Sequence, residues 1–390
     1  MLRLEHGQVR TPAFVPLATR GAVRTLAPAD VRALGYEMVL GNTFHLMLSP
    51  GPDLIESFGG LHEFMRWPAP IITDSGGFQV FSMGHGGVAD EIKGRGRSGR
   101  SDGAIVSIEE DGVRFRSYID GSEWFMGPET SMQVQAALRS DIALAFDECT
   151  PFHATRDYTA RSTERTHRWL ARCLRWHDEH GPRGQTVYGI VQGGVEHDLR
   201  LASSQAVVQS GCDGIAIGGS LGRDKHQMHE VVAWTTAELH RLAPERPRHL
   251  LGIGEIDDLI VGVELGIDTF DCAMPTRLAR HGIALVPDPA ARWRVDLVKS
   301  RWRGCSEAVL DGCPCPVCAA GFTRGYVHYL LRAGELTGMR LLTEHNLGFI
   351  ARLMADLRLA INTGELPRVA AALRAGAAPV GETQSSQLDK

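Results

Sequence analysis

The sequence lacks any long hydrophobic run. None of its apolar stretches approaches the roughly 20 consecutive residues that a membrane-spanning helix requires. The stretch from Met1 to Arg10 alternates charged with apolar residues, unlike a secretory signal. Cysteine is also scarce, because eight in 390 residues are too few for a scaffold built on disulfides. We therefore expect a cytosolic (cytoplasmic) protein with reduced thiols and no membrane partner.

The chain has no overall excess of positive charge either. Its formal net charge is −5, so the whole-chain balance gives no sign of a nucleic-acid partner. The distribution of charge along the chain does give such a sign. Between positions 277 and 303 there are seven Lys or Arg and two Asp, a local net charge of 7 − 2 = +5, and Trp293 and Trp302 lie among them. A basic segment with aromatic residues is the footprint expected of a phosphate-contacting surface, although a solvated basic face explains such a run about as often.

What the chain does contain is a series of short apolar runs. With 43% hydrophobic residues it can bury one large core. Eight runs each carry a polar residue or a glycine at or near their C-terminal end: 14–19, 38–43, 70–75, 142–147, 187–192, 214–219, 249–254 and 269–274. Short apolar strands separated by helical stretches are typical of parallel strands buried on both faces, and eight of them predict an α/β chain with a closed (β/α)₈ TIM barrel.

The C-terminal ends of these runs supply the candidate site residues, because catalytic residues of such barrels follow the strands. They are Asn42, Asp74, Asp147, Gln192, Gly218, Gly219, Gly252 and Asp271. Two carboxylates at one barrel mouth, Asp74 and Asp271, suit glycosidic chemistry, in which one attacks or stabilises the anomeric carbon and the other moves protons. A single aspartate there is as often structural as catalytic, but two with Gln192 and a glycine pair favour a site.

Helical patterns fill most gaps between the runs, at 131–139, 157–180, 197–209, 224–241 and 257–265. Two gaps are longer. Residues 85–107 are rich in Gly, Ser and Arg and predict a mobile loop, with plain surface disorder as the alternative. A hairpin should follow it, with its turn at Asp111-Gly112. The second gap follows the last run and precedes a closing helix from about His345 to Asn362.

Three cysteines in this second gap predict a metal site. Cys313, Cys315 and Cys318 form Cys-x-Cys-x2-Cys, and a tetrahedral zinc shell needs a fourth ligand. We favour His345, at the predicted start of the closing helix, over its competitor His328. A shell of three thiolates and one imidazole leaves no open position for water, so one structural Zn²⁺ per subunit is expected.

These observations predict three parts of the chain. Residues 1–274 and 345–375 would form the TIM-barrel catalytic domain. Residues 275–344, inserted after the last barrel strand, would form a zinc-binding subdomain that carries the basic segment. Residues 376–390 have the composition of a disordered tail.

The motifs together resemble those of the tRNA-guanine transglycosylases, the queuine/7-deazaguanine tRNA-ribosyltransferases, of bacterial type. The resemblance runs nearly end to end and is carried by residues 74–79 (DSGGFQ), 145–149 (AFDEC), 191–194 (VQGG), 216–219 (AIGG), 270–272 (FDC), 275–277 (PTR), and the three cysteines with 343–346 (TEHN). It implies a homodimer whose zinc subdomain contacts tRNA. The implied reaction exchanges the wobble guanine of GUN anticodons for a 7-deazaguanine, in queuosine biosynthesis.

The resemblance also implies a role for each of the two aspartates. Exchange with retained configuration needs two inversions, so a covalent tRNA intermediate on a carboxylate is the economical route. Asp271 is the implied nucleophile. Asp74 would protonate the leaving guanine and later deprotonate the incoming base, which requires a pKa raised by an apolar site and by neighbouring carboxylates.

The same resemblance implies a set of base-binding residues: Ser75, Phe78, Asp147, Cys149, Gln192, Gly218, Gly219 and Leu251. Asp147 would accept hydrogen bonds from the guanine-like edge. Gln192 and the Gly219 N–H would bind the exocyclic oxygen, while Phe78 and Leu251 would sandwich the ring.

RNA contacts are implied for two arginines after the last run. Arg277 and Arg280 match family positions that contact the bases flanking the target, and the basic segment beyond them would hold phosphates. The target nucleotide itself would have to be flipped out of the anticodon loop.

The chain departs from the family pattern where the incoming base is selected. Many bacterial members carry Leu-Ala-Val-Gly-Glu after the glycine pair, and residues 220–224 here read SLGRD. Gly222 resembles eukaryotic members that accept queuine, whereas Cys149 resembles bacterial ones. The 7-aminomethyl base is favoured, with queuine salvage as the alternative.

Readings from other classes also stay open. A non-catalytic RNA-binding partner subunit would lack the nucleophile, but Asp74 and Asp271 are both present. A hydrolase of small nucleosides would have no use for the zinc site and the basic segment. An enzyme that places 7-deazaguanine in DNA fits less well than the tRNA branch.

Overall fold

The computed structural model describes residues 1–84 and 105–381. At its centre lie eight parallel strands in the order β3-β13-β12-β11-β10-β9-β5-β4. A parallel bridge between Leu17, just beyond β3, and Leu40 of β4 joins the two outermost strands and closes the barrel. The barrel strands are β3 (Ala13–Val15), β4 (Val39–Gly41), β5 (Ile71–Thr73), β9 (Ile142–Leu144), β10 (Thr186–Val191), β11 (Gly214–Ile217), β12 (Arg248–Leu250) and β13 (Thr269–Asp271). Each of the eight apolar runs overlaps one strand, so the predicted (β/α)₈ fold class is confirmed.

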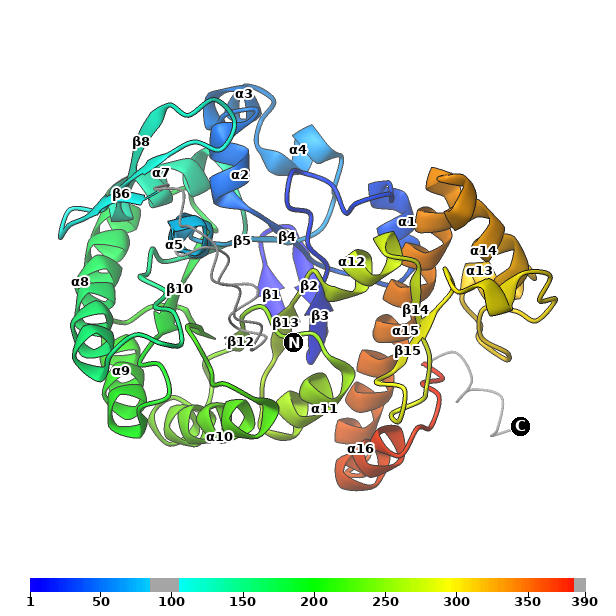
Figure 1. The fold of residues 1–390 in the computed structure, drawn as a ribbon. Helices are drawn as coiled ribbons and strands as arrows, with labels where there is room; N and C mark the ends of the chain where they lie inside the picture. Colours follow the sequence, from blue (N-terminus) through cyan, green and yellow to red (C-terminus); the bar gives the residue numbers. More distant parts are fainter. Residues whose placement is uncertain (85–104, 382–390) are drawn as a thin grey trace.

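The strands are short and buried on both faces, as their sequences require. A small core of side chains from alternate strand positions fills the barrel interior, including Val15, Leu40, Ile72 and Ile190. A larger core packs the outer faces of the strands against the helices. The returning helices are α7 (Pro128–Leu138), α8 (Arg156–His180), α9 (His197–Gln209), α10 (Lys225–Leu242) and α11 (Ile256–Glu264). They lie within about three residues of the predicted ranges and ring the barrel in Figure 1.

Short elements connect the first barrel strands. The helices are α1 (Pro28–Ala33), α2 (Thr43–Leu48), α3 (Pro52–Ser57), α4 (Leu61–Met65) and α5 (Gly77–Gly84). A three-stranded antiparallel sheet of β6 (Ile105–Ile108), β7 (Val113–Arg116) and β8 (Glu123–Met126) follows. The Glu109 N–H donates to the Gly112 carbonyl at 2.9 Å, which closes the turn predicted at Asp111-Gly112. Most of the predicted mobile loop, residues 85–104, lies outside the described residues.

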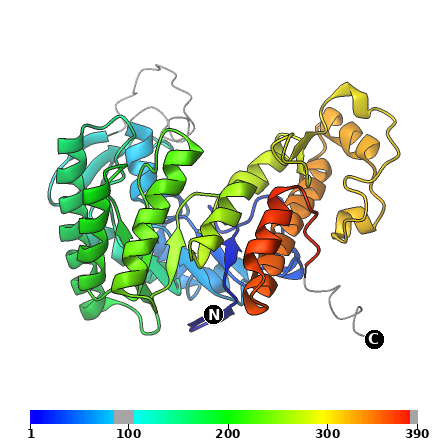
Figure 2. The same ribbon diagram turned by 90° about the horizontal axis from the view of Figure 1, so that it is seen from below.

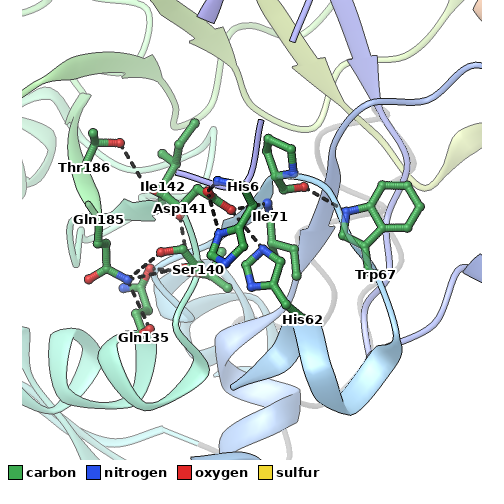
Figure 3. Close-up of polar contacts among 12 residues, drawn as sticks. His6, His62, Trp67, Ile71, Gln135, Ser140, Asp141, Ile142, Gln185 and Thr186 are labelled. Carbon is green, nitrogen blue, oxygen red and sulfur yellow. Dashed lines mark hydrogen bonds and ion pairs between the residues drawn. The ribbon is translucent and has the colours of Figure 1, made fainter. Parts of the chain in front are cut away.

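An N-terminal hairpin covers the end of the barrel from which the strands start. It consists of β1 (Leu2–Leu4) and β2 (Gly7–Val9), and Figure 2 shows it at one end of the molecule. The carboxylate of Asp141 binds its turn. Asp141 accepts four N–H donors: the main chain and ring of His6 at 2.9 and 3.0 Å, the His62 ring at 3.0 Å and the Ile71 main chain at 2.8 Å (Figure 3). One buried carboxylate therefore ties the hairpin to α4 and β5.

A separate lobe follows the last barrel strand and stands to one side of the barrel (Figure 2). It comprises α12 (Met274–Arg280), β14 (Ile283–Leu285), β15 (Arg294–Asp296), a 3₁₀ turn η1 (Ser300–Trp302), α13 (Pro316–Ala319) and α14 (Arg324–Ala333). Its buried residues form their own cluster, which includes Leu297, Val327 and the three cysteines. The division of the chain into domains stays a prediction.

The chain closes with α15 (Leu336–Asn362) and α16 (Leu366–Arg374). α15 begins nine residues before His345 (345 − 336 = 9), so the boundary predicted at 344/345 falls inside one continuous helix. Of the predicted tail, Val380 and Gly381 donate main-chain N–H groups to Asp356 of α15, both at 2.8 Å. Residues 382–390 lie outside the described part of the chain.

Within residues 1–84 and 105–381, no helix is both long enough and apolar enough to span a membrane.

Candidate active site and metal centre

Asp74 directly follows β5, at the C-terminal end of the barrel. Its carboxylate accepts hydrogen bonds from the Asn42 amide and, at 2.9 Å, from the main-chain N–H of Thr43. Burial raises the pKa of Asp74 to about 7; the Thr43 and Gly76 N–H groups oppose the rise, while the negative charges of Asp271 and Asp147 add to it. Asp74 therefore exchanges a proton close to neutral pH.

Asp271 ends β13 and is held by the neighbouring strand. Its Oδ1 accepts from His249 Nε2 at 3.1 Å and from the Gly252 main-chain N–H at 3.0 Å. His249 is fully buried, and its Nδ1 lies 2.8 Å from the hydroxyl of Thr269. The geometry suits donation from His249 Nε2–H to the carboxylate oxygen, with the second ring nitrogen in a hydrogen bond with the Thr269 hydroxyl. Among the described residues every hydrogen bond to this carboxylate is made at Oδ1, and none is made at Oδ2.

Asp147 lies beyond β9 in the same space. Its Oδ1 accepts from the Ser75 hydroxyl at 2.9 Å and its Oδ2 from Gln192 Nε2 at 2.7 Å. Burial raises its pKa to about 6, against the lowering effect of these two hydrogen bonds. Gly77 makes the close approach possible, since a Cβ there would lie 2.6 Å from the Asp147 carbonyl oxygen.

The glycine pair after β11 packs against Gln192, which follows β10. A Cβ on Gly219, whose φ is +80°, would lie 2.2 Å from Gln192 Oε1. A Cβ on Gly218 would lie 3.1 Å from a methyl carbon of Leu251. A side chain at either position would therefore press on Gln192 or Leu251, and the structure brings Ser75, Asp147, Gln192 and the glycine pair together.

Two other predicted residues have less direct contacts. Cys149 is buried; burial, reinforced by the charge of Asp147, raises the pKa of its thiol to about 12, so it stays neutral and is no nucleophile. Phe78 lies half-buried in α5. Its predicted stacking with Leu251 around a base stays a prediction.

The three cysteines of the lobe converge with His345. Their ligand atoms lie within 4.8 Å of one another and all four residues are buried. His345 Nδ1 lies 3.4 Å from Cys315 Sγ and 3.5 Å from Cys318 Sγ. These separations match the roughly 3.6 Å edge of a tetrahedron with Zn–S of about 2.3 Å and Zn–N of about 2.0 Å. The cluster could hold a metal ion and is consistent with a zinc site.

The surroundings of the cluster prepare these residues as ligands. His345 Nε2–H donates to the Leu285 carbonyl at 2.8 Å, which leaves the Nδ1 lone pair for a metal. Arg352 donates to Cys313 Sγ at 3.0 Å and so stabilises a thiolate. The competitor His328 is used elsewhere, because its Nδ1 donates to the Leu297 carbonyl at 2.8 Å.

Comparison with known proteins agrees with this arrangement. A family model described as queuine tRNA-ribosyltransferase matches residues 1–377. The chain belongs to this family. Proteins named queuine tRNA-ribosyltransferase from Roseiflexus sp. (strain RS-1) and Pelotomaculum thermopropionicum are 47% and 44% identical to it, over 94% of this chain and over 93% and 91% of their own lengths. One from Thiobacillus denitrificans is 43% identical, over 93% of this chain and 90% of its own. The predicted resemblance to the tRNA-guanine transglycosylase enzymes is confirmed.

In this member of the queuine tRNA-ribosyltransferase family the two predicted RNA-binding arginines lie on α12, next to the end of β13. The pKa of Arg280 is lowered by burial and by the positive charges of Arg24 and Arg277, so three guanidinium groups gather here. Two more guanidinium groups lie over the ring of Trp302. The guanidinium carbons of Arg301 and Arg324 are 4.7 and 4.8 Å from the ring centre.

Trp293 does not belong to the basic surface that the sequence suggested. It is 3% exposed, and its ring N–H donates to Asp257 at 2.9 Å. Its place in the sequence among charged residues hid its packing role, because the turn before β15 directs it inward.

Sequence reasoning missed two buried residues at this family's site, His249 and Arg200. His249 stands in an apolar run and pairs with Thr269 across β12 and β13, so Asp271, two positions further, lies on the same face. Arg200 lies on the buried face of α9 with Ser203, Ser204 and Val207. A lone arginine on the face of a helix that packs against a barrel is the signal that could have found it.

Proposed function

We propose that this chain is a cytosolic tRNA-guanine transglycosylase, which exchanges the wobble guanine of GUN anticodons for a 7-deazaguanine by double displacement. The observation that carries the proposal is the pair of aspartates at the ends of β5 and β13. Among the described residues, Asp271 has one carboxylate oxygen that accepts no hydrogen bond. Asp74 has a pKa of about 7, which the negative charge of Asp271 helps to raise. A nucleophile and a proton-transfer group are what the exchange requires.

In the first displacement, Oδ2 of Asp271 attacks C1′ of the ribose as the C1′–N9 bond breaks. The bonding pair leaves with guanine, which receives the proton of Asp74. In the second displacement, Asp74 takes a proton from the incoming base, whose N9 attacks C1′ and expels the Asp271 carboxylate. Two inversions retain the configuration at C1′, and Asp74 ends in its original state.

The base would be recognised by Asp147, Gln192 and the glycine pair. In the free protein the Asp147 carboxylate accepts hydrogen bonds from the Ser75 hydroxyl and the Gln192 amide. These two donors occupy the positions that the N–H donors of a bound base would take. The carboxylate would accept from the adjacent N–H donors of guanine, and Gln192 with the Gly219 N–H would then donate to its exocyclic oxygen. Ser75, Cys149, Gly218, Leu251 and Phe78 complete the proposed base site.

Zinc is the metal we propose for the four-residue cluster. Cys313, Cys315, Cys318 and His345 would supply all four ligands, which leaves no place for water or substrate. The ion would hold the cysteine loop on α15 and take no part in the chemistry. Arg277, Arg280 and the basic residues after them would contact the tRNA, and the enzyme would work as a homodimer.

The incoming base we favour is 7-aminomethyl-7-deazaguanine, because Cys149 and the bacterial relatives support the bacterial type. Gly222, the residue that resembles the queuine-accepting members, is explained by the backbone conformation at this position. Its φ is +134°, and a Cβ there would lie 3.0 Å from Gln227. Asp224 accepts the Gln227 main-chain N–H at 2.9 Å as the cap of α10, so its carboxylate is already engaged. Queuine salvage is therefore the alternative that the experiment must test.

The test is release of radiolabelled guanine from a tRNA with guanine at the wobble position. The aminomethyl base and queuine are offered separately to the wild type and to Asp271→Asn. We expect exchange with the aminomethyl base that Asp271→Asn abolishes, while Asp257→Asn, a control at a surface aspartate of α11, keeps it. Exchange with queuine alone would identify a salvage enzyme, and tRNA binding without exchange of either base would identify a non-catalytic subunit.

A further inference from the structure

Arg200 is the charged side chain with the most unusual environment near the proposed site. It is fully buried on α9. Its guanidinium donates to four main-chain carbonyls: Gly194 at 2.7 Å, Val191 at 3.1 Å, Gly218 at 2.9 Å and Ser220 at 3.2 Å. Within the described part of the chain none of its hydrogen-bond partners is a carboxylate.

Burial of an arginine without a counter-ion is costly, and here the cost is met by carbonyl dipoles. Burial lowers the pKa of Arg200 to about 10, so the group keeps its charge at neutral pH. The planar guanidinium offers five N–H donors in a fixed fork, which suits it to several acceptors at once. A structural core position would be served more cheaply by an apolar side chain of similar size.

The four carbonyls belong to two different loops. Val191 and Gly194 lie at and after the end of β10, and Gly218 and Ser220 follow β11. One guanidinium therefore spans the ends of two neighbouring barrel strands. Gln192 and Gly193 lie between the anchors on the first loop, and Gly219 lies between those on the second. Gln192 and Gly219 are the proposed partners of the exocyclic oxygen of the base.

The bond to Gly218 also sets a direction. In a trans peptide the C=O and the following N–H point in opposite directions. Because the Gly218 carbonyl points to Arg200, the Gly219 N–H points away from it and into the site. The same N–H lies close enough to the Cys149 thiol to affect its pKa, which agrees with that direction.

We propose that Arg200 is a positioning residue that aims the Gly219 N–H, together with Gln192, at the exocyclic oxygen of the bound base. The proposal rests on the function proposed above. Arg200 does not touch the base, and it acts through the two loops that it joins. Its loss should therefore weaken binding of a base in proportion to the strength of that oxygen as an acceptor.

The test compares two free ligands by calorimetry, without the need for catalysis. Guanine has the exocyclic oxygen, whereas 6-thioguanine keeps the N–H donors but presents a sulfur, which accepts hydrogen bonds weakly. We expect Arg200→Met to weaken guanine binding tenfold or more and 6-thioguanine binding by less than threefold. Arg200→Lys, which keeps the charge but cannot bind both loops at once, should lie between the wild type and Arg200→Met.

Arg248→Met is the matched control. Arg248 is also buried and also donates to a carbonyl, that of Gly266 at 3.4 Å, but it begins β12 at the opposite end of the barrel. It should lose thermal stability and bind guanine as the wild type does. Equal losses for both ligands in Arg200→Met, or unchanged guanine binding, would overturn the proposal.

Two further outcomes keep the test decisive. If Arg200→Met does not fold, the same comparison of ligands on Arg200→Lys decides, with a guanine-selective loss of at least threefold expected. Wild type that neither binds guanine nor exchanges it would refute the proposed function. If the wild type exchanges guanine and the Arg200 variants bind guanine normally, the proposed role of Arg200 is refuted and the proposed function stands.

Discussion

The two aspartates of the proposed mechanism are held in different ways. Among the residues that the structure describes, Asp271 accepts hydrogen bonds on Oδ1 alone, from His249 and Gly252. Asp74 is held on both oxygens, by Asn42 and Thr43. Asp271 is thus left one unengaged oxygen for attack, whereas Asp74, with a pKa raised by burial to about 7, is placed to move a proton in either direction.

Guanine release should slow as the pH rises through about 7. In the proposed mechanism the leaving base takes its proton from Asp74, and the protonated fraction of a group with a pKa of about 7 falls about tenfold for each further pH unit. Single-turnover release from saturating tRNA between pH 6 and 9 would measure this slope. Residual release by Asp74→Asn should have no such inflection, and a wild-type rate that stays flat to pH 9 would rule out Asp74 as the acid.

Asp74 should also lower the free energy of unfolding at neutral and alkaline pH, where its carboxyl group is ionised. Its pKa is raised in the folded protein, so the folded state binds more protons than the unfolded state between about pH 4 and 7. Stability is therefore lost as the pH rises through this window. Asp74→Asn should melt several degrees higher than the wild type at pH 8, with the difference gone near pH 4. An equal difference at both pH values would contradict this account.

At the scale of the elements, the carboxylate of one residue ties the N-terminal hairpin to the barrel. Asp141 accepts from His6 of the hairpin, from His62 of α4 and from β5 (Figure 3). Burial alone would raise the pKa of this carboxyl, but the hydrogen bonds from His62, His6 and Ile71 lower it to about 2. The stabilisation is therefore present above the unfolded-state pKa and is lost as the pH falls towards 2.

Asp141→Asn should therefore destabilise the protein at pH 7 by about 2–3 kcal/mol, because an amide cannot accept from all these donors. Urea unfolding at pH 7 and at pH 3 would show the difference between mutant and wild type shrinking at the lower pH. Glu5→Gln, an exposed neighbour in the same hairpin, should change stability by less than about 0.5 kcal/mol. An Asp141→Asn variant as stable as the wild type would show that the hairpin is held by its apolar side chains alone.

At the scale of the whole molecule, the metal cluster links the lobe to the barrel through α15. His345 lies inside that helix, and its Nε2–H is bonded to β14. Loss of the metal should therefore loosen the cysteine loop and also the packing of α15 on its neighbours.

His345→Ala should purify without the proposed zinc and melt at a lower temperature, by an amount typical of a lost structural metal. His328→Ala, which removes a similarly buried histidine from the same lobe, should keep one zinc per chain. Metal content by atomic absorption and thermal melting would check both. If His345→Ala keeps zinc and His328→Ala loses it, then His328 and not His345 is the fourth ligand.

Much of this arrangement could be predicted from local patterns in the chain. The eight apolar runs and their polar ends predicted the barrel and the positions of Asp74, Asp147 and Asp271, because burial on both faces of a strand is visible in a few consecutive residues. The cysteine spacing predicted the metal cluster for a similar reason. The start of α15 was placed too late, because its N-cap residue Glu335 makes no side-chain capping hydrogen bond and Gly338 stands in the first turn, so the sequence carries no distinct helix-start signal there.

What the sequence by itself determined was therefore the set of strands, the loops that carry the site and the chemistry those loops offer. Only the tertiary structure decided which side chains hold that chemistry in place. His249 reaches Asp271 because of the register between β12 and β13, and Arg200 reaches two loops because α9 packs beneath them. Both contacts join residues far apart in the chain, and such pairings depend on the packing of whole elements, which no local pattern of residues records.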